Sequence, residues 1–364
     1  MGAYGFTALK IADLLCEAGI SFSIAGRNRE EMARLKDHYS IIKDSFVVDI
    51  SDEDATRMLI SKADVIINCI GPYNLYGGNV LKFCVEEGKC CIDISGEQNY
   101  VRRSFEQYGE LAMETGACII HSLAFESALA DLIASSRLNR KDNWEEISSI
   151  YYFEKSTPSP GTRLTMQVSK FFPCFCVQDS ILKEAGIGSF KRNVENVRQP
   201  EMDVIVFMPY PEVYFFYKQY RPKHAATYLL SGKIDASIIM AGTDIKQTLE
   251  SVLEREARRK KRVPDKEECS RHYFELILYA LNAGGEEIAI RISGHNMYMI
   301  TASLVFTFLY RMLNEDYFPV GIHTPSEVFP EPEKVIELIS NTNSLVIDWN
   351  VDFKIQKEDP GYTF

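Results

Sequence analysis

The sequence lacks the features that mark most nucleic-acid-binding and zinc-binding proteins. Its 40 lysines and arginines stand against 51 acidic residues, a formal net charge of −11 at pH 7. Binding to nucleic acid requires clustered cations, and the chain shows no RNP, helix-turn-helix or zinc-finger pattern. Cys174-x-Cys176 is not a metal spacing, and no Cys or His pair completes a zinc site. We therefore expect no nucleic-acid partner and no metal.

Further absences concern the compartment. No basic segment followed by an apolar one opens the chain, so we expect no signal peptide. The nine cysteines are odd in number and lie mostly in apolar runs, which favours reduced thiols over a disulfide framework. The apolar run from Met297 to Leu313 is shorter than the roughly 20 residues that span a bilayer, so we expect a buried helix of a second domain. A cytoplasmic protein is the resulting prediction.

What the sequence does contain begins at its first residues. The spacing Gly2-x-x-Gly5-x-x-Ala8 is a variant of the glycine fingerprint that opens a dinucleotide-binding βαβ unit. An apolar pattern at helical spacing follows and stops at Gly19. A pyrophosphate would lie at the amino end of that helix. The cofactor-binding residues predicted here are Gly2, Ala3, Tyr4, Gly5, Phe6 and Thr7.

The next two predicted strands concern the choice of cofactor. Ile20 to Ala25 is a short alternating run, and Arg27 and Asn28 follow it where an NAD-specific site carries an acid. An arginine suits a 2′-phosphate, so we expect NADP, with NAD possible; the alternative is that Arg27 is an ordinary surface residue. Residues 46–49 form a third predicted strand, which ends with Asp49 near the adenine edge.

Two more predicted strands end in loops that would face the nicotinamide. The run 63–70 leads into Gly71, Pro72 and Tyr73, which we expect beside the nicotinamide ribose. The run 90–94 leads into a loop that contains Glu97. Tyr73 and Glu97 are the predicted catalytic residues, although Glu97 could equally satisfy loop N–H groups. Asp93 and His121 are weaker candidates for a catalytic role near these loops. For His121 the reason is that lone histidines are more often structural.

At this point the sequence resembles a known family. Its motifs are similar to those of the saccharopine dehydrogenase-like oxidoreductases, a group that includes trans-acting enoyl reductases of lipid synthesis. The residues that carry the resemblance are Gly2 to Thr7, Ala25 to Asn28, Gly71-Pro72-Tyr73-x-x-Tyr76-Gly77, Asp93 to Glu97, Gly161-Thr162-x-x-Thr165, Ser293-Gly294-His295-Asn296-x-Tyr298-x-x-Thr301-Ala302 and Thr324-Pro325-Ser326. The resemblance implies a Rossmann domain, an α+β domain that often mediates dimerisation, and a return of the chain to the first domain.

The sequence also departs from this family. No apolar strand precedes Gly2, Ala8 replaces the third glycine, and the segment Gly-Phe-Asp-Ser-x-Pro-x-Asp appears as residues 124–131 with three changes. A missing central strand leaves backbone groups unpaired. Either the protein starts upstream, or the member is decayed, or another segment fills the gap. As written, the turn should fray and NADPH should bind poorly.

The fold class expected is α/β: a Rossmann-type parallel sheet without an obvious first strand, followed by an α+β domain. The predicted domains are 1–140, 141–320 and 321–364, the last returning to the first. Within the second we expect a strand at 147–153, a helix at 162–168 and paired strands at 274–281 and 288–292. The aromatic run 210–217 is either the wall of an apolar pocket or core, and the basic run 258–262 is a solvated helix end or a contact with anionic lipid.

These observations predict an NADP-preferring oxidoreductase that reduces a carbonyl, an imine or an activated double bond. A lipid-linked substrate and a homodimer are implied by the resemblance alone. Peripheral contact with a membrane is a weaker expectation. The alternative is a decayed, non-catalytic member that acts as a binding or scaffold protein, which the departures from the family pattern favour.

Overall fold

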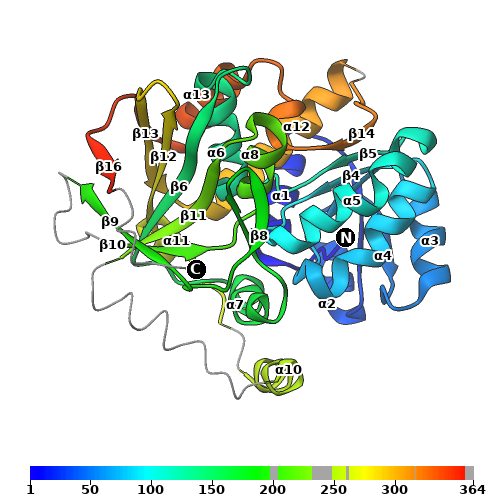
Figure 1. Ribbon diagram of the computed structural model, residues 1–364. Coiled ribbons are helices and arrows are strands. Elements are labelled where there is room, and N and C mark those ends of the chain that lie inside the picture. The colour runs from blue at the N-terminus through cyan, green and yellow to red at the C-terminus, as the bar shows by residue number, and fades with distance from the viewer. Residues whose placement is uncertain (197–203, 232–247, 260–261, 316, 357–364) are drawn as a thin grey trace. The chain divides into compact units, whose positions relative to one another are not determined.

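The computed structural model describes residues 1–196, 204–231, 248–259, 262–315 and 317–356 (Figure 1). The chain forms two compact units, and each is assembled from three separate segments. Unit 1 contains 1–128, 158–165 and 297–330, and unit 2 contains 129–157, 166–296 and 331–364. The predicted domains divide the chain differently and stay predictions, because sequence order does not show which segments pack together.

Unit 1 is an α/β unit with short parallel strands. Its strands are β1 (Phe22–Gly26), β2 (Ile42–Val47), β3 (Val65–Asn68), β4 (Cys90–Asp93), β5 (Cys118–Ile120) and β14 (Gly321–His323). Its helices are α1 (Phe6–Glu17), α2 (Arg29–His38), α3 (Glu53–Ser61), α4 (Tyr73–Glu86), α5 (Gln98–Thr115) and α12 (Met297–Glu315). Strands and helices alternate along the chain, as a parallel sheet with helical crossovers requires. The predicted fold class is thereby confirmed for this half.

The parallel strands of unit 1 form two sheets. β1 pairs with β2 in one, and the other has the order β14-β5-β4-β3. Of these strands, Figure 1 labels β14, β5 and β4, which lie side by side. The strand predicted at 46–49 corresponds to β2, which starts and ends earlier. Lys43 and Asp44 are exposed on β2 and break the apolar pattern, so the sequence does not show where this strand begins. The strands β3 and β4 lie where the sequence predicts them.

The first residue of the chain lies between the two sheets. The amino group of Met1 donates to the carbonyl oxygen of Ile67 at 2.6 Å, and the N–H of Cys69 donates to the carbonyl oxygen of Met1 at 3.1 Å. This is the pattern of a parallel strand beside β3. On the other side, the N–H of Gly2 donates to the carbonyl oxygen of Ala25 at 3.0 Å. Met1 and Gly2 therefore connect β3 to β1.

Two segments from the last part of the chain, α12 and β14, also belong to unit 1. α12 packs against α1, and β14 pairs with β5 in parallel. After β14, Thr324 begins the short 3-10 helix η2 (Pro325–Glu327) with a capping box. The sequence predicted α12 as a buried helix, which is confirmed, but placed it in the second domain. Apolar spacing reports that a helix is buried and does not report its partner.

Unit 2 is built on one large mixed sheet with the order β15-β13-β12-β6-β11-β10-β9-β16, and β7 and β8 lie off this path. Its strands are β6 (Trp144–Glu154), β7 (Phe175–Gln178), β8 (Ile181–Glu184), β9 (Lys191–Asn196), β10 (Val204–Met208), β11 (His224–Ser231), β12 (Tyr273–Asn282), β13 (Glu287–His295), β15 (Val346–Asp348) and β16 (Phe353–Ile355). The predicted pairing of 274–281 with 288–292 is confirmed as the antiparallel pair β12 and β13.

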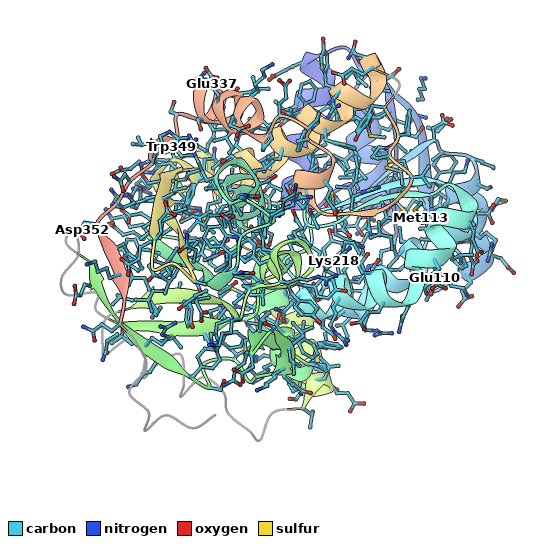
Figure 2. All side chains as sticks on the ribbon, turned by 45° about the horizontal axis from the view of Figure 1, so that its top comes forward. Glu110, Met113, Lys218, Glu337, Trp349 and Asp352 are labelled. Atoms are coloured by element: carbon cyan, nitrogen blue, oxygen red, sulfur yellow. The ribbon has the colours of Figure 1, made fainter. Side chains whose placement is uncertain are left out.

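The helical parts of unit 2 are α8 (Glu212–Tyr220), α10 (Leu249–Arg258), α11 (Lys266–Arg271), α13 (Pro332–Asn343) and the 3-10 helix η1 (Ser169–Phe171). Two helices, α6 (Phe125–Arg137) and α7 (Pro160–Val168), contribute residues to both units. The Arg137 guanidinium lies 4.1 Å from the centroid of the Trp349 ring, which follows β15. Trp349 is labelled in Figure 2.

Two predictions that left alternatives open fall in unit 2. The aromatic run lies largely in α8, where Val213, Phe215 and Phe216 are fully buried, so this segment is core. Of the basic run, Lys260 and Lys261 lie outside the described residues, whereas Arg258 forms an ion pair with Glu254 at 3.4 Å. Among the helices that the structure describes, none combines the length and the apolar character that crossing a bilayer needs.

Candidate functional site

The glycine turn has the backbone that the fingerprint predicts. Gly2 has a φ of 72°, and a Cβ at this position would lie 2.9 Å from the carbonyl oxygen of Cys69. Glycine is therefore required both by the left-handed conformation and by the close approach of β3. The N–H of Gly5 donates to the carbonyl oxygen of Gly2 at 2.9 Å and closes the turn. Gly5 is the N-cap of α1, so Phe6 and Thr7 lie in its first turn.

The helices that follow the strands of unit 1 differ in how their amino ends are capped. α2 is capped by the side chain of Asn28, which accepts from the N–H groups of Glu30 and Glu31 at 2.9 and 3.1 Å. α3 is capped by Asp52, which accepts from the N–H of Ala55. The N-cap of α1 is a glycine, which has no side chain to offer. The first N–H groups of α1 are thus left for an anion, which a helix amino end attracts.

Tyr4 and Ala3 line the turn on the side of β1. A Cβ at Gly26 would lie 2.7 Å from the Tyr4 ring, so the ring covers the last residue of β1. Ala3 and Tyr4 pack against the cluster that contains Ile24 and Met32. These contacts hold the turn onto the sheet. The predicted roles of Ala3 and Tyr4 in binding a cofactor stay predictions.

Arg27 and Asp49 follow β1 and β2 and are exposed. The hydrogen bonds from the Ser51 N–H and hydroxyl lower the pKa of Asp49, and the Arg27 guanidinium lowers it further by a smaller amount. Asp49 accepts both of these hydrogen bonds, at 3.0 and 2.8 Å. Asn28, by contrast, is used to cap α2. Of the residues predicted at the adenosine end, Arg27 thus has an exposed charge available to a ligand.

The predicted nicotinamide side contains Gly71, Pro72, Tyr73 and Glu97. Pro72 is the N-cap of α4, and the Glu97 carboxylate accepts from the N–H groups of Tyr73 and Asn74 at 2.5 and 2.8 Å. Burial raises the pKa of Glu97 to about 7, although both N–H groups favour the carboxylate. Glu97 therefore makes the loop contacts that the sequence offered as the alternative to catalysis.

Tyr73 is buried, with 5% of its surface exposed. Its hydroxyl donates to the carbonyl oxygen of Asn68 at 2.7 Å, and burial raises its pKa well above the usual value. These partners fix the hydroxyl against the end of β3. A catalytic role for Tyr73 or Glu97 stays a prediction, since the contacts described are structural ones.

A row of buried polar side chains crosses the carboxyl ends of three neighbouring strands. Asn68 ends β3, Asp93 ends β4, and His121 follows β5. His121 Nδ1 lies 2.6 Å from Asp93 Oδ2, and Nε2 lies 2.6 Å from Ser104 Oγ. The sequence indicated Asp93 and His121 but not Ser104, which lies in the middle of α5 without a motif of its own. Because Asp93, His121 and Ser104 are buried, this arrangement braces the loops instead of meeting a substrate.

Among the residues that the structure describes, no three His, Cys, Asp or Glu side chains are grouped in a way that could hold a metal ion.

Comparison with known proteins finds relatives for about the first third of the chain. The family model "Saccharopine dehydrogenase NADP binding domain" matches residues 1–120. A saccharopine dehydrogenase-like oxidoreductase of Bos taurus is 32% identical over 148 residues, which cover 36% of this chain and 34% of that relative. A lipid droplet localized protein of Caenorhabditis elegans is 33% identical over 142 residues, 36% of this chain and 33% of that relative. The match thus spans about a third of the length of these curated relatives.

The fold comparison covers nearly the whole chain. Apo saccharopine dehydrogenase (L-Glu forming) of Saccharomyces cerevisiae matches with a TM-score of 0.61 and 12% identity, over 97% of this chain and 98% of that one. At this identity the match concerns the fold. It confirms the predicted Rossmann-type architecture with a second α+β part.

The names of the relatives contradict one prediction. A cytoplasmic location was expected from the free thiols and the opening residues. However, one relative is named for the lipid droplet, and an Arabidopsis thaliana relative, 32% identical over 147 residues, is described as a probable mitochondrial saccharopine dehydrogenase-like oxidoreductase. The cytoplasmic prediction is therefore wrong, because reduced cysteines are compatible with several compartments.

The motifs and the comparisons agree over the same stretch of chain. The turn at Gly2 to Thr7, the strand end at Arg27 and the loop at Gly71 all lie within the matched residues. The predicted resemblance is confirmed over residues 1–120, which match the saccharopine dehydrogenase NADP-binding domain, and this match also bears out the predicted NADP cofactor.

Proposed function

We propose that this protein is an NADPH-dependent oxidoreductase that reduces a carbonyl, an imine or an activated double bond. The observation that supports it best is the amino end of α1, where a glycine N-cap leaves N–H groups for a pyrophosphate. The exposed Arg27, one strand away, supplies a cation for the 2′-phosphate. The family match to an NADP-binding domain concerns these same residues.

The residues present fit the dinucleotide. A Cβ at Gly2 would meet the carbonyl oxygen of Cys69, so the turn can lie this close to the end of β3 only because residue 2 is glycine. When bound, NADPH supplies a hydride. The chain's own groups would orient it: α1 would hold the pyrophosphate, Arg27 the 2′-phosphate, and the loop at Gly71 would lie beside the nicotinamide ribose. Glu97 would keep that loop in place through Tyr73 N–H and Asn74 N–H.

For the substrate we propose a small molecule linked to a lipid. The support is the resemblance to enoyl reductases of lipid synthesis and the relative named for the lipid droplet. A homodimer is proposed from the resemblance, and light scattering of the purified chain would test it.

Titration calorimetry with NADPH and NADH tests the cofactor site. A charge-assisted contact contributes about 1.5–3 kcal/mol, so NADPH should bind roughly tenfold or more tightly than NADH. The variant Arg27→Ala should lose this preference and leave NADH binding unchanged. Arg34→Ala is the matched control, because Arg34 is exposed on α2 and pairs with Glu31 at 2.9 Å. Equal affinity of the wild type for both nucleotides would refute the assignment of Arg27.

A second candidate is a family member that binds the nucleotide without turnover. The specific observation in its favour is that both predicted catalytic groups make structural hydrogen bonds, Tyr73 to Asn68 and Glu97 to the start of α4. The two functions separate in one assay: NADPH oxidation with acyl-linked ketone, imine and enoyl substrates. Oxidation with any of them supports the reductase. Tight binding with no oxidation across the set supports the non-catalytic member.

A further inference from the structure

Two motifs that lie far apart in the sequence meet within unit 1. The N–H of Ser159 donates to the hydroxyl of Tyr298 at 2.7 Å, and Thr162 Oγ1 lies 3.3 Å from the same hydroxyl. Ser159 Oγ accepts in turn from the N–H of Thr162 at 3.2 Å. The segment 158–165, which contains the start of α7, is thereby fastened to the first turn of α12.

Tyr298 and this segment each contact one of the two loops of the proposed cofactor site. The Tyr298 ring packs edge to face against Phe6, with centroids 4.8 Å apart and an angle of 88° between the rings. Phe6 is the first residue of α1. Thr165, in α7, packs against the other loop, because a Cβ added at Gly71 would lie 3.6 Å from Thr165 Oγ1. Tyr298 therefore links the start of α1 to the segment 158–165, and Thr165 of this segment lies against the loop at Gly71.

The start of α12 is itself held at the carboxyl edge of the sheet. The N–H of Phe125, in the segment that follows β5, donates to Thr301 Oγ1 at 3.1 Å, and this hydroxyl donates to the carbonyl oxygen of Met297. Tyr298 is one turn before Thr301 on this anchored helix. Its hydroxyl is consequently a fixed point against which residues 158–165 are placed.

We propose that Thr165 contacts the nicotinamide half of bound NADPH, and that Tyr298 is a positioning residue that holds the segment 158–165 in place for this contact. The inference rests on the proposed function and adds residues from outside the matched 1–120 to its site. A threonine hydroxyl both donates and accepts, so it can bond the ribose hydroxyls or the carboxamide of that half. Glycine at position 71 leaves room between the loop and Thr165.

The test compares two ligands that share one half. NADPH contains the nicotinamide ribose, whereas 2′,5′-ADP contains the adenosine and the 2′-phosphate without it. The loss of one hydrogen bond weakens binding about three- to tenfold. Thr165→Val should therefore lower the affinity for NADPH by this factor and leave the affinity for 2′,5′-ADP unchanged. The matched control is Thr342→Val, because Thr342 is exposed on α13 and its hydroxyl bonds its own helix at 2.7 Å.

The variant Tyr298→Phe tests the positioning role. It keeps the ring against Phe6 and removes the hydroxyl that Ser159 and Thr162 contact. We expect the same selective loss for NADPH. Tyr310→Phe is its control, since Tyr310 lies on the same helix and is 52% exposed.

The outcomes separate the two proposals. If the wild type binds neither ligand, the proposed function fails and this inference falls with it. If the wild type binds both and Thr165→Val binds NADPH normally, or loses both ligands equally, the inference alone is overturned. If Thr165→Val binds NADPH more weakly but 2′,5′-ADP normally, and Thr342→Val binds both ligands normally, the inference about Thr165 is supported. A Tyr298→Phe variant with unchanged NADPH affinity overturns the positioning role.

Discussion

The two parallel sheets of unit 1 follow the same strand-loop-helix pattern but end in different side chains. After β1 and β2 come Arg27 and Asp49, which are exposed and charged. At the ends of β3, β4 and β5 lie Asn68, Asp93 and His121, each with none of its surface exposed. One edge therefore presents charge to solvent, whereas the other encloses polar groups within the protein.

The difference assigns separate tasks to the two edges. An exposed cation can pair with a phosphate and contributes little to folding. A buried polar group must be hydrogen-bonded, and once it is, it fixes the loops that supply its partners. We expect variants on the first edge to change cofactor affinity and variants on the second to change stability. Each prediction below breaks or sharpens this contrast.

The largest effect is expected from Asp93→Ala. The Asp93 carboxylate pairs with His121 and accepts from the N–H groups of Ser122 and Ser95 at 2.9 and 3.1 Å. Removing it leaves three buried donors without their acceptor, which typically costs about 3–5 kcal/mol. The measurement is the free energy of unfolding in urea. Asp44→Ala, at an exposed position of β2, is the control and should change stability by about 0.5 kcal/mol or less. Equal effects from the two variants would contradict the contrast.

The next largest effect concerns Glu97 and pH. Its pKa in the folded protein is about 7, above the ordinary 4.5, because it is buried. An acid with a raised folded pKa contributes stability that is fully present below about pH 4.5 and is lost as the pH rises through 7. At 1.36 kcal/mol per pKa unit the loss reaches about 3 kcal/mol.

We therefore expect the free energy of unfolding of the wild type to fall between pH 5 and pH 8. The Glu97→Gln variant cannot ionise, so its curve should fall less over the same range. The exposed acid Glu53, in the first turn of α3, provides the control Glu53→Gln, which should keep the wild-type slope. Parallel curves for the wild type and Glu97→Gln would show that burial does not control this carboxyl group.

The strands of the buried edge were the easier part to predict. β3, β4 and β5 are short apolar runs that end in a polar loop, and buried parallel strands have this appearance. β2 was misplaced, since its Lys43 and Asp44 face solvent at the outer strand and hide the pattern. The glycine turn was predictable because a tight turn and a close backbone approach both demand glycine at position 2.

The sequence could not predict which side chains hydrogen-bond to one another. Nothing near Ser104 indicates that it meets His121, since the two become neighbours only when α5 packs on the sheet. In the same way, the motifs around Thr162 and Tyr298 were visible, but their hydrogen bond joins residues 136 positions apart. Periodicity shows which residues are buried and leaves open which segments they face.

A smaller effect on stability is expected from lengthening the backbone segment between the two sheets of unit 1. Met1 donates from its amino group to Ile67, and burial lowers the pKa of that amino group, which means that its charge is poorly solvated. An extension of about five apolar residues before Met1 would replace the amino group by a peptide N–H and lengthen the connection that Met1 and Gly2 make between β3 and β1. A few added backbone hydrogen bonds should stabilise the protein by about 1–3 kcal/mol.

The same extension should strengthen NADPH binding, because the turn at Gly2 would be better fixed. Melting curves with and without NADPH measure both effects. An extension of equal length made of glycine and serine is the control, and it should leave the melting temperature near that of the unextended chain. Should both extensions behave alike, strand pairing would not be the cause.

The smallest effect is expected at the exposed edge, from Asp49→Asn. Asp49 holds a negative charge beside Arg27, and the two charges interact. Asparagine keeps the acceptor for the Ser51 N–H at 3.0 Å, so the local turn should survive. With the charge removed, Arg27 attracts a 2′-phosphate without competition, and NADPH should bind about two- to threefold more tightly at low salt, where exposed charges are least screened. NADH has no 2′-phosphate and should bind as before. Calorimetry at two salt concentrations measures this, and the gain should vanish at high salt. If NADH instead binds more weakly to the variant, Asp49 contacts the nucleotide directly, as the sequence predicted, and the exposed edge carries two ligand contacts in place of one.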